Sequence, residues 1–398
     1  MPPLFLIPFL IFLFFCLLHI ICLPAYVFFT ALPDGVPKPT PFADLHDILL
    51  AGACWRRGVD VYVPSACLHG GVFNYSPFFL RLSVLPFGPR DTLPGGILMA
   101  LGFFASLALL PTGAPGWLLA GALSPAVYYG IEQGNFDIVI FIMTVLGVVA
   151  LRRAGLVAYA VFALAAALKF YPAALLVMAL REPRRRFVML AGLGAAAGLV
   201  FLAFYGRDVL AALRVLPSGT PFRATFGRID FARGLNWLHV LTARRADALA
   251  GPVFTSGEGA ARALSWLMSV VAIAASAALA RRRSVDDPFL LAGSLVVVCS
   301  FYAAQNVEYR AVFLLLTLPA LARSTRWLRV AVLVLLWEAA VRACLPAAPR
   351  LAFWVLREAL WWWVVTQLGA LVLAYVTAQV ARLRREGPKK IDAGRKNP

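Results

Sequence analysis

Phe42-Ala43-Asp44-Leu45-His46-Asp47 begins a polar loop that continues to Pro77 and separates the first two hydrophobic spans of the chain. The sequence is 62% hydrophobic and only 14% charged, which is too apolar for a soluble protein of several domains. This composition, over a chain of 398 residues, predicts an all-α polytopic membrane protein. The formal charge of +18 does not indicate a nucleic-acid partner, because Lys and Arg cluster between apolar runs, where they orient spans and contact membrane lipids.

Apolar runs long enough to cross the bilayer, or half of it, follow one another along the chain. We expect about twelve, near residues 4–30, 91–111, 114–130, 136–151, 155–169, 171–181, 187–205, 263–281, 288–304, 309–322, 329–346 and 359–381. The first run lacks a basic n-region and a cleavage site, so it is interpreted as a retained span. Lys169 and Tyr171-Pro172 interrupt the apolar sequence from 155 to 181, which predicts a broken helical hairpin.

Basic segments assign the two sides of the membrane. If the spans alternate, one side receives Arg152-Arg153, Arg181 with Arg184 to Arg186, Arg281 to Arg283, Arg323, Arg326, Arg329 and the tail from Arg382. The positive-inside rule makes this side cytoplasmic, together with both termini. We expect a single transmembrane domain over residues 1–381 and a disordered polar tail over 382–398.

The first extracytoplasmic loop contains two segments with the pattern of interfacial helices. Leu45, Ile48, Leu49 and Ala53 recur at helical spacing after a candidate cap at Asp44. Residues 78–85 form the second segment, between two prolines. Cys54 and Cys67 both lie in this loop, where an oxidising compartment permits a disulfide, and the sequence leaves that pairing open. Four further cysteines, interpreted as small core residues, are Cys16, Cys22, Cys299 and Cys344.

Several polar residues fall at or just below the extracytoplasmic ends of spans, where an ionisable side chain is a functional candidate. They are Asp44, Asp47, Glu132, Asn135, Asp137, Lys169, Tyr171, Glu308 and Arg310. We expect them to converge on one wet cavity. No phosphate-binding glycine loop, no Cys-x-x-Cys pair and no His-Glu-x-x-His motif is present, so nucleotide hydrolysis and a thiolate zinc site are not expected, and we assign no cofactor and no metal ligand. His46, His69 and His239 are isolated and are interpreted as polar surface residues.

Asp44 is the best candidate for a general base, because a base must be a carboxylate held on a structured element. The alternative is that it only caps its helix. Asp47, one turn later, has a supporting role or is a solvated first-turn acid. Lys169 contacts a phosphate or extends to the interface. Arg310 binds a phosphate or forms a local ion pair with Glu308.

The loop 206–262 is rich in arginines, which are Arg207, Arg214, Arg223, Arg228, Arg233, Arg244, Arg245 and Arg262. Long translocated loops escape the positive-inside rule, so these residues need another explanation. They bind anionic lipid or pyrophosphate-like headgroups, or they form a solvated basic surface; the sequence supports both equally.

Short motifs in a fixed order carry a resemblance to a known family. They are Phe42-Ala-Asp44-Leu, Gly58-Val-Asp-Val-Tyr62, Phe73-Asn74-Tyr75-Ser-Pro77, Ser124-Pro125, Gly134-Asn-Phe-Asp137, Ala167-Leu-Lys-Phe-Tyr-Pro172, Glu308-Tyr-Arg310 and Leu318-Pro-Ala320. Over residues 1–322 the chain resembles the polytopic bacterial glycosyltransferases of family 87, which are polyprenol-phosphate-mannose-type transferases with the C-type membrane fold. Two departures are Val61-Tyr62 in place of the usual Pro-Tyr, and Ser76 between Tyr75 and Pro77. Both lie in the acceptor-side loop.

The resemblance implies a bacterial inner-membrane enzyme with an extracytoplasmic active site, a polyprenyl-phosphate-linked sugar as donor, a glycan or glycolipid acceptor, and inversion at the anomeric carbon. Asp44 then matches the catalytic aspartate of the first loop. Lys169, Arg310 and the Gly134-Asn135 turn line the donor pocket, to which we add Asp137, Tyr171 and Glu308. Asn74 and Tyr75 support the site.

Two other functions stay open at this stage. A transporter or flippase of lipid-linked sugars needs the same basic cavity but no base. A membrane scaffold needs neither Asp44 nor Lys169.

Overall fold

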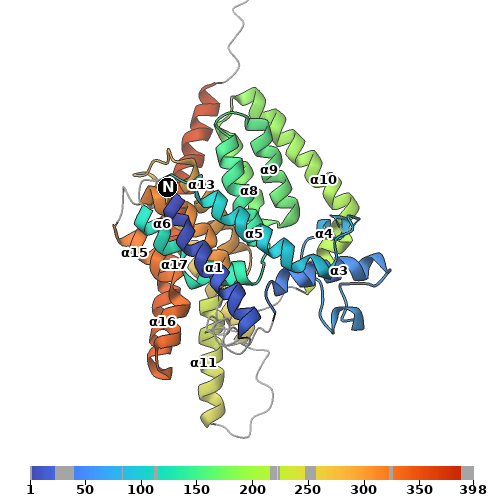
Figure 1. Cartoon of the computed structure of the whole chain (residues 1–398). Coiled ribbons are helices and arrows are strands. Elements are labelled where there is room, and N and C mark those ends of the chain that lie inside the picture. Colours follow the sequence, from blue (N-terminus) through green and yellow to red (C-terminus); the bar gives the residue numbers. More distant parts are fainter. Residues whose placement is uncertain are drawn as a thin grey trace, which may run out of the picture.

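The computed structural model describes residues 2–22, 40–82, 84–111, 115–215, 222, 225–246, 257–321 and 326–386, and it is almost entirely helical (Figure 1). One two-stranded antiparallel pair adds to the expected all-α architecture: β1 (Thr225–Phe226) pairs with β2 (Asn306–Val307).

The first half of the chain contains α1 (Pro2–Ile21), α3 (Ala43–Arg56), η1 (Ala66–Leu68), α4 (Phe78–Leu82), η2 (Pro89–Asp91), α5 (Thr92–Leu107), α6 (Pro115–Ala122), α7 (Pro125–Glu132), α8 (Asp137–Ala150), α9 (Gly155–Leu168) and η3 (Tyr171–Arg181). The second half contains α10 (Arg184–Arg214), α11 (Asp230–Ala246), α12 (Gly257–Ala280), α13 (Pro288–Ala303), η4 (Glu308–Leu316), α14 (Leu318–Leu321), α15 (Arg326–Leu336), α16 (Glu338–Cys344) and α17 (Ala347–Arg385). The η elements are 3₁₀ helices.

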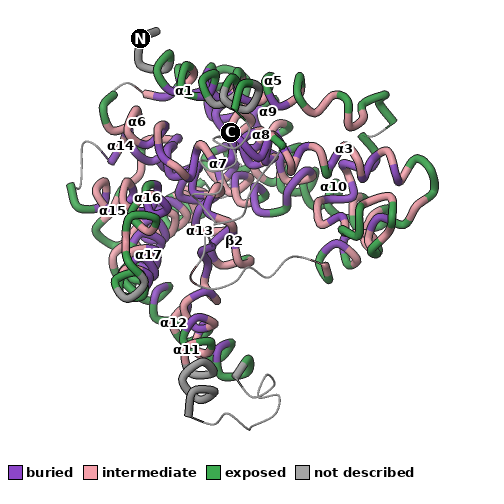
Figure 2. The backbone as a smooth tube through the Cα atoms, turned by 60° about the horizontal axis from the view of Figure 1, so that its bottom comes forward, coloured by how far each residue is buried: buried purple, intermediate pink, exposed green. Residues whose placement is uncertain are grey.

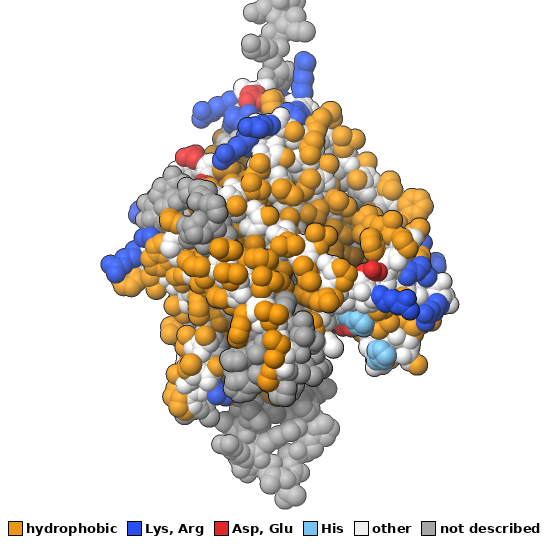
Figure 3. Space-filling model, viewed as in Figure 1, with side chains coloured by type: hydrophobic (Ala, Val, Ile, Leu, Met, Phe, Trp, Pro, Cys, Tyr) orange, Lys and Arg blue, Asp and Glu red, His pale blue; other side chains and the backbone are white. Residues whose placement is uncertain are grey.

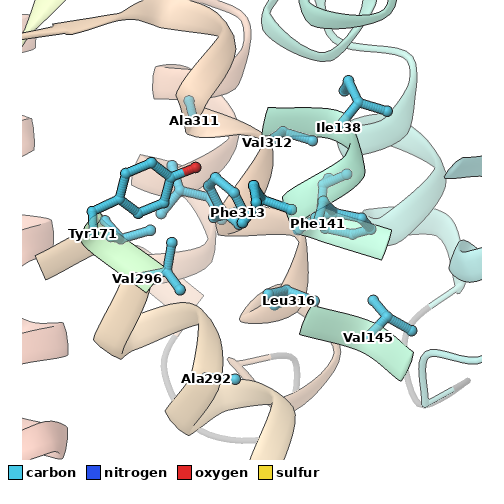
Figure 4. Close-up of a cluster of buried hydrophobic side chains, with 14 of the residues drawn as sticks. Ile138, Phe141, Val145, Tyr171, Ala292, Val296, Ala311, Val312, Phe313 and Leu316 are labelled. Carbon is cyan, nitrogen blue, oxygen red and sulfur yellow. The ribbon is translucent and has the colours of Figure 1, made fainter. Parts of the chain in front are cut away.

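The core lies where α8, α13, η3 and η4 meet (Figure 4). Every residue of η4 from 311 to 316 has 0% exposure, so this segment is surrounded by protein on all sides. Phe313 lies between Tyr171 and Phe141, with ring centroids 5.7 and 6.3 Å away. Figure 2 shows buried residues gathered around α7, α8 and α13, whereas α11 lies at the margin.

Three helices in the described part of the chain are long and apolar enough to cross a membrane: 184–214, 258–280 and 349–385. A fourth span results if α7 and α8, which meet at a bend of 108°, are taken together. The expected number of about twelve is therefore not reached by length and composition. Several predicted runs fold as shorter helices instead, among them 155–168, 171–181 and 288–303.

The outer helix α10 has the exposed apolar surface that is typical of a helix facing lipid. Only Val209 and Ala212 of this apolar helix are buried, and its large side chains are exposed along its length. Water would penalise such a surface heavily, whereas lipid would not. A broad hydrophobic belt crosses the molecule in Figure 3, with lysines and arginines above it near the end of α17.

Basic segments that are distant in sequence meet at one end of the helices. Arg152 and Arg283 line the same cavity as Leu328. Arg382 donates to the carbonyl oxygens of Leu180 and Glu182, at 2.8 and 2.9 Å. The predicted grouping of these segments on one side is thus found in the structure. Residues 322–325 and 387–398 lie outside the described residues, so Arg323 and most of the predicted tail are not described; residues 382–385 belong to α17.

The first loop holds the predicted interfacial helix, α3, but its cap differs from the prediction. Phe42, in the left-handed conformation with φ 60°, occupies the N-cap position, and Asp44 lies in the first turn. The ring of Phe42 fills the space where a side chain on Gly96 would lie, since a Cβ there would approach it to 2.3 Å. The cap role predicted for Asp44 is therefore wrong, and its carboxylate binds elsewhere.

Two further features of the loop concern its length and its cysteines. The second predicted helix forms as α4, which is shorter than the expected 78–85 segment. Cys54 and Cys67 form a disulfide, the pairing that the sequence left open. Cys22 and Cys344 are exposed rather than buried in the core, as the sequence had suggested, and Cys299 is half-buried. The side chain of Cys16 lies outside the described part of the structure.

Candidate active site

Four polar segments meet at the end of the bundle opposite the basic end. They are the start of α3, the turn between α7 and α8, the break after α9, and the start of η4. The backbone N–H groups of Phe42 and Asp44 donate to the carbonyl oxygens of Glu132 and Gln133, at 2.7 and 2.9 Å. These bonds fix the first turn of α3 against the Gly134-Asn135 turn, where Gly134 has φ 59°.

Asp137 is the centre of the site and is 1% exposed. Its carboxylate accepts hydrogen bonds from Lys169 Nζ at 2.6 Å, from the Tyr171 hydroxyl at 2.5 Å and from Arg310 Nε at 3.1 Å. A carboxylate can be buried this deeply because two cations and a phenol satisfy it. Asp137 therefore holds three residues that the sequence assigned to the donor pocket.

The break at Lys169 is found where the sequence predicted it. α9 ends at Leu168, and Lys169 adopts an extended backbone (φ −139°, ψ 135°) before η3 begins. Its side chain is only 9% exposed and points to Asp137. The alternative of a lysine reaching to the interface is therefore not what the structure shows.

Arg310 and its neighbour Glu308 point to different clusters. Arg310 pairs with Asp137 and donates to the side chain of Asn306. Glu308, 1% exposed, lies 3.5 Å from Arg342 instead. The alternative of a local ion pair between Glu308 and Arg310 is therefore wrong. Glu308 also does not join the other predicted donor-site residues around Asp137.

Asn135, fully buried, joins Asp44 to this cluster. Its Nδ2 donates to Asp44 Oδ2 at 2.5 Å and to the Tyr75 hydroxyl at 3.5 Å. Its Oδ1 accepts from Lys169 Nζ at 3.0 Å and from the backbone N–H of Asp137 at 2.9 Å. One amide side chain therefore sets the position of Asp44 relative to Lys169.

Tyr75 and Asp47, both in the first loop near Asp44, differ in their surroundings: Tyr75 is buried and Asp47 is exposed. Burial, and next the nearby Asp44 carboxylate, raises the pKa of Tyr75 well above its usual 10, so the phenol keeps its proton. The ring of Tyr75 also lies 5.3 Å from Lys169 Nζ. Asp47 is exposed one turn after Asp44 and stays at the edge of the cluster.

A cavity of about 500 Å³ opens beside the cluster. It is lined by Asn74, Tyr75, Lys169, Tyr171, Tyr309 and Arg310, and also by Arg228, Arg233 and Gln305. Four of its lining residues are cations, and no Asp or Glu of the described chain lines it. Such a lining favours an anion. Asp44 is not among the lining residues and connects to the cavity through Asn135 and Tyr75.

Arg228 and Arg233 were individually missed by the sequence analysis, although both belong to its arginine-rich loop. Arg228 donates to the carbonyl oxygen of Tyr302 at 2.8 Å and packs over Trp266. Arg233 donates to Gln305 at 3.0 Å. These two arginines line the cavity and are half-buried, so they do not form a solvated surface. Residues 216–221, 223–224 and 247–256 lie outside the described residues, as do the side chains of residues 239–246, so Arg223, Arg244, Arg245 and His239 are not described.

This arrangement can bind a phosphate in the cavity and present a carboxylate beside it. Within the described ranges, no three His, Cys, Asp or Glu side chains are grouped so that they could hold a metal ion.

Comparison with known proteins gives one match. The family model for glycosyltransferase family 87 matches residues 73–303, which is more than half of the chain. This range includes Tyr75, Asn135, Asp137, Lys169, Arg228 and Arg233. Asp44 lies before it and Arg310 after it. No curated protein and no solved structure matches the chain.

Proposed function

Because the chain belongs to glycosyltransferase family 87, we propose that it transfers a hexose, with mannose favoured, from a polyprenyl-phosphate donor to a glycan or lipid-linked acceptor. Transfer takes place on the extracytoplasmic side of the membrane and inverts the anomeric carbon. The C-type glycosyltransferase fold is part of the same proposal.

The observation that carries this proposal is the cationic cavity beside a positioned carboxylate. Four cations line the cavity: Lys169, Arg228, Arg233 and Arg310. Asn135 is hydrogen-bonded to both Lys169 and Asp44 and so connects the cavity to the carboxylate. A lipid phosphate is an anion that such side chains bind well, and the guanidinium groups can bind it in a bidentate manner. The exposed apolar helix α10, whose Ala212 and Leu213 line the cavity, provides a route for the polyprenyl chain along the lipid.

Asp44 would act as general base in the reaction. Its carboxylate takes the proton of an acceptor hydroxyl, whose oxygen forms a bond to the sugar C1. The bond between C1 and the phosphate oxygen breaks, and the polyprenyl phosphate leaves with the electron pair. Attack from the face opposite the phosphate inverts the anomeric carbon. Lys169 and the arginines stabilise the charge that develops on the leaving group, a contribution that is commonly large.

The orientation follows from the distribution of charge. The segments around Arg152, Arg283 and Arg382 meet at one end, which the positive-inside rule makes cytoplasmic. The candidate site lies at the opposite end. The disulfide between Cys54 and Cys67 is in the same region as the site, and disulfides persist in oxidising compartments.

The test is a transfer assay with the purified full chain in liposomes. Undecaprenyl-phosphate-linked mannose, glucose and galactose are each supplied with octyl α-D-mannoside and a lipid extract as acceptors. We expect one donor to give a glycosylated acceptor and free undecaprenyl phosphate. Movement of the donor across the bilayer without either product would support a flippase and contradict the proposal.

Replacement of Arg233 by glutamine should weaken donor use. Arg233 lines the cavity and its described hydrogen bond is to a neutral amide, so the substitution removes a cation without breaking an ion pair. We expect the donor KM to rise about tenfold, because this factor corresponds to the free energy of one charge-assisted hydrogen bond. The acceptor KM should stay unchanged.

The matched control is Arg262→Gln, which removes an exposed arginine paired with Glu258 on α12. It should leave both KM values as in the unmodified chain. If Arg233→Gln and Arg262→Gln have the same donor KM, the cavity does not bind the donor.

A further inference from the structure

A second cavity, of about 250 Å³, lies next to the candidate active site. Its lining includes Phe222, Glu338, Arg342, Phe353, Trp354 and Arg357. It lies between α11, α16 and the first part of α17. The lining residues from α16 and α17 follow the matched family region, whereas Phe222 and α11 lie within it. Its volume is near the small end of ligand pockets, which suits one ring rather than a chain.

The two cavities share a polar wall. Gln305 lines the first cavity and donates to Asp230. Asp230 lies 3.5 Å from Arg357, which lines the second cavity. A ligand in the second cavity is therefore a neighbour of a phosphate in the first.

The charges around the second cavity are close to balanced. Arg357, 2% exposed, pairs with Glu338 at 3.2 Å and with Glu358 at 2.5 Å, as well as with Asp230. Arg342 pairs with Glu308 at 3.5 Å. These acids and arginines neutralise one another, in contrast to the cationic first cavity. Arg350, the remaining charged residue of the lining, donates to the Leu345 carbonyl oxygen at 2.6 Å. Neither a free anion nor a free cation is favoured here.

Glu338 and Trp354, which both line this cavity, each have one buried polar atom with no hydrogen-bond partner among the described residues. These atoms are Glu338 Oε2 and Trp354 Nε1, on side chains that are 2% and 3% exposed. One is an acceptor and the other is a donor, and each is costly when left unpaired. A hydroxyl group supplies both complements, because it donates one hydrogen bond and accepts others.

The aromatic residues set the shape of the remaining space. Trp354 is fixed by Phe231, whose ring is stacked 5.6 Å away, and by Gly234, where a Cβ would lie 2.2 Å from the indole. Phe222 and Phe353 complete an apolar wall beside the polar atoms. An apolar wall facing a hydroxyl-binding pair fits a pyranose, which has apolar C–H faces and a rim of hydroxyl groups.

We propose that this second cavity binds a neutral hexose unit of the acceptor, held by hydroxyl hydrogen bonds to Glu338 and Trp354. The identity of the ligand as acceptor rests on the proposed function. The cavity then places the acceptor glycan beside the phosphate of the donor, across the Gln305–Asp230–Arg357 wall.

The first test is binding without any transfer. Methyl α-D-mannopyranoside, methyl α-D-glucopyranoside and methyl β-D-galactopyranoside are each mixed with the full chain in detergent micelles and observed by saturation-transfer NMR. We expect at least one glycoside to bind. Trp354→Phe, which keeps the ring and removes the N–H group, should weaken that binding about fivefold. Glu338→Gln should weaken it as well.

The controls separate this cavity from general destabilisation and from the donor site. Trp363→Phe alters an exposed tryptophan of the same helix, and Arg233→Gln alters the first cavity. Both should bind the glycoside as the unmodified chain does. The inference is overturned if the folded unmodified chain binds no glycoside, or if Trp354→Phe and Glu338→Gln both bind normally.

Transfer kinetics distinguish this inference from the proposed function. Trp354→Phe should raise the acceptor KM and leave the donor KM unchanged. Glycoside binding without transfer from any donor would contradict the proposed function but not the sugar-binding cavity. Transfer with an unaltered acceptor KM in Trp354→Phe would contradict the cavity assignment alone. Displacement of the glycoside by undecaprenyl-phosphate-mannose would assign the cavity to the donor sugar and overturn the acceptor assignment.

Discussion

Asp44→Asn is expected to lower the rate of sugar transfer by about 10³-fold while the protein still inserts, folds and binds its donor. General bases contribute on the order of 10²–10⁴-fold to enzyme rates, and an amide cannot take the proton of the acceptor hydroxyl. The substitution keeps an oxygen that can accept the hydrogen bond from Asn135, now 2.5 Å away. It also leaves the backbone bond from Asp44 to Gln133 intact.

The measurement is the transfer assay in liposomes, with donor binding and thermal unfolding followed on the same preparation. Asp60→Asn is the matched control, because Asp60 is an exposed acid of the same loop whose hydrogen bond to the Tyr62 N–H can be made by an amide oxygen. It should transfer sugar at the unmodified rate. If Asp44→Asn has near-normal activity, Asp44 is not the general base.

The polar residues of the site could be found from sequence because a charge in an apolar run is costly unless it is used. This reasoning singled out Lys169, Asp137 and Arg310, and the structure joins all three. It could not tell which side chain pairs with which. Glu308 and Arg310 are two residues apart on a 3₁₀ helix, and they point to different clusters. Their directions depend on the packing of distant helices, which one sequence does not specify.

The number of spans and the C-terminal region were harder to predict. Hydropathy finds apolar runs but does not show where a buried run bends or shortens, so α7 and α8 could not be read as a pair meeting at 108°. The family resemblance covered residues 1–322, and no candidate site residue was proposed beyond it. Glu338 and Arg357 lie there as ordinary helical charges in sequence, and only the fold brings them to Asp230.

The second large effect concerns stability and the buried pair of Asp137 and Lys169. Asp137→Asn should lower the free energy of unfolding by about 3–5 kcal/mol, the usual loss when a buried charge loses its partner. Two cations, Lys169 and Arg310, would be left without the carboxylate that both contact. Lys169→Met should cost less, because Asp137 keeps its bonds to Tyr171 and Arg310.

A double-mutant cycle in detergent, with unfolding followed by denaturant titration, measures both effects. The combined Asp137→Asn/Lys169→Met variant should be more stable than the sum of the single losses predicts, by about 0.5–3 kcal/mol, because the two side chains are in direct contact. The control is Glu258→Gln, which breaks the exposed pair with Arg262 and should cost no more than about 1 kcal/mol. If Lys169→Met is more damaging than Asp137→Asn, or if the two losses simply add, Asp137 is not the residue that holds the cations of the site in place. The leaving-group role assigned to Lys169 and Arg310 would then lose its structural basis, even if Asp44 is the base.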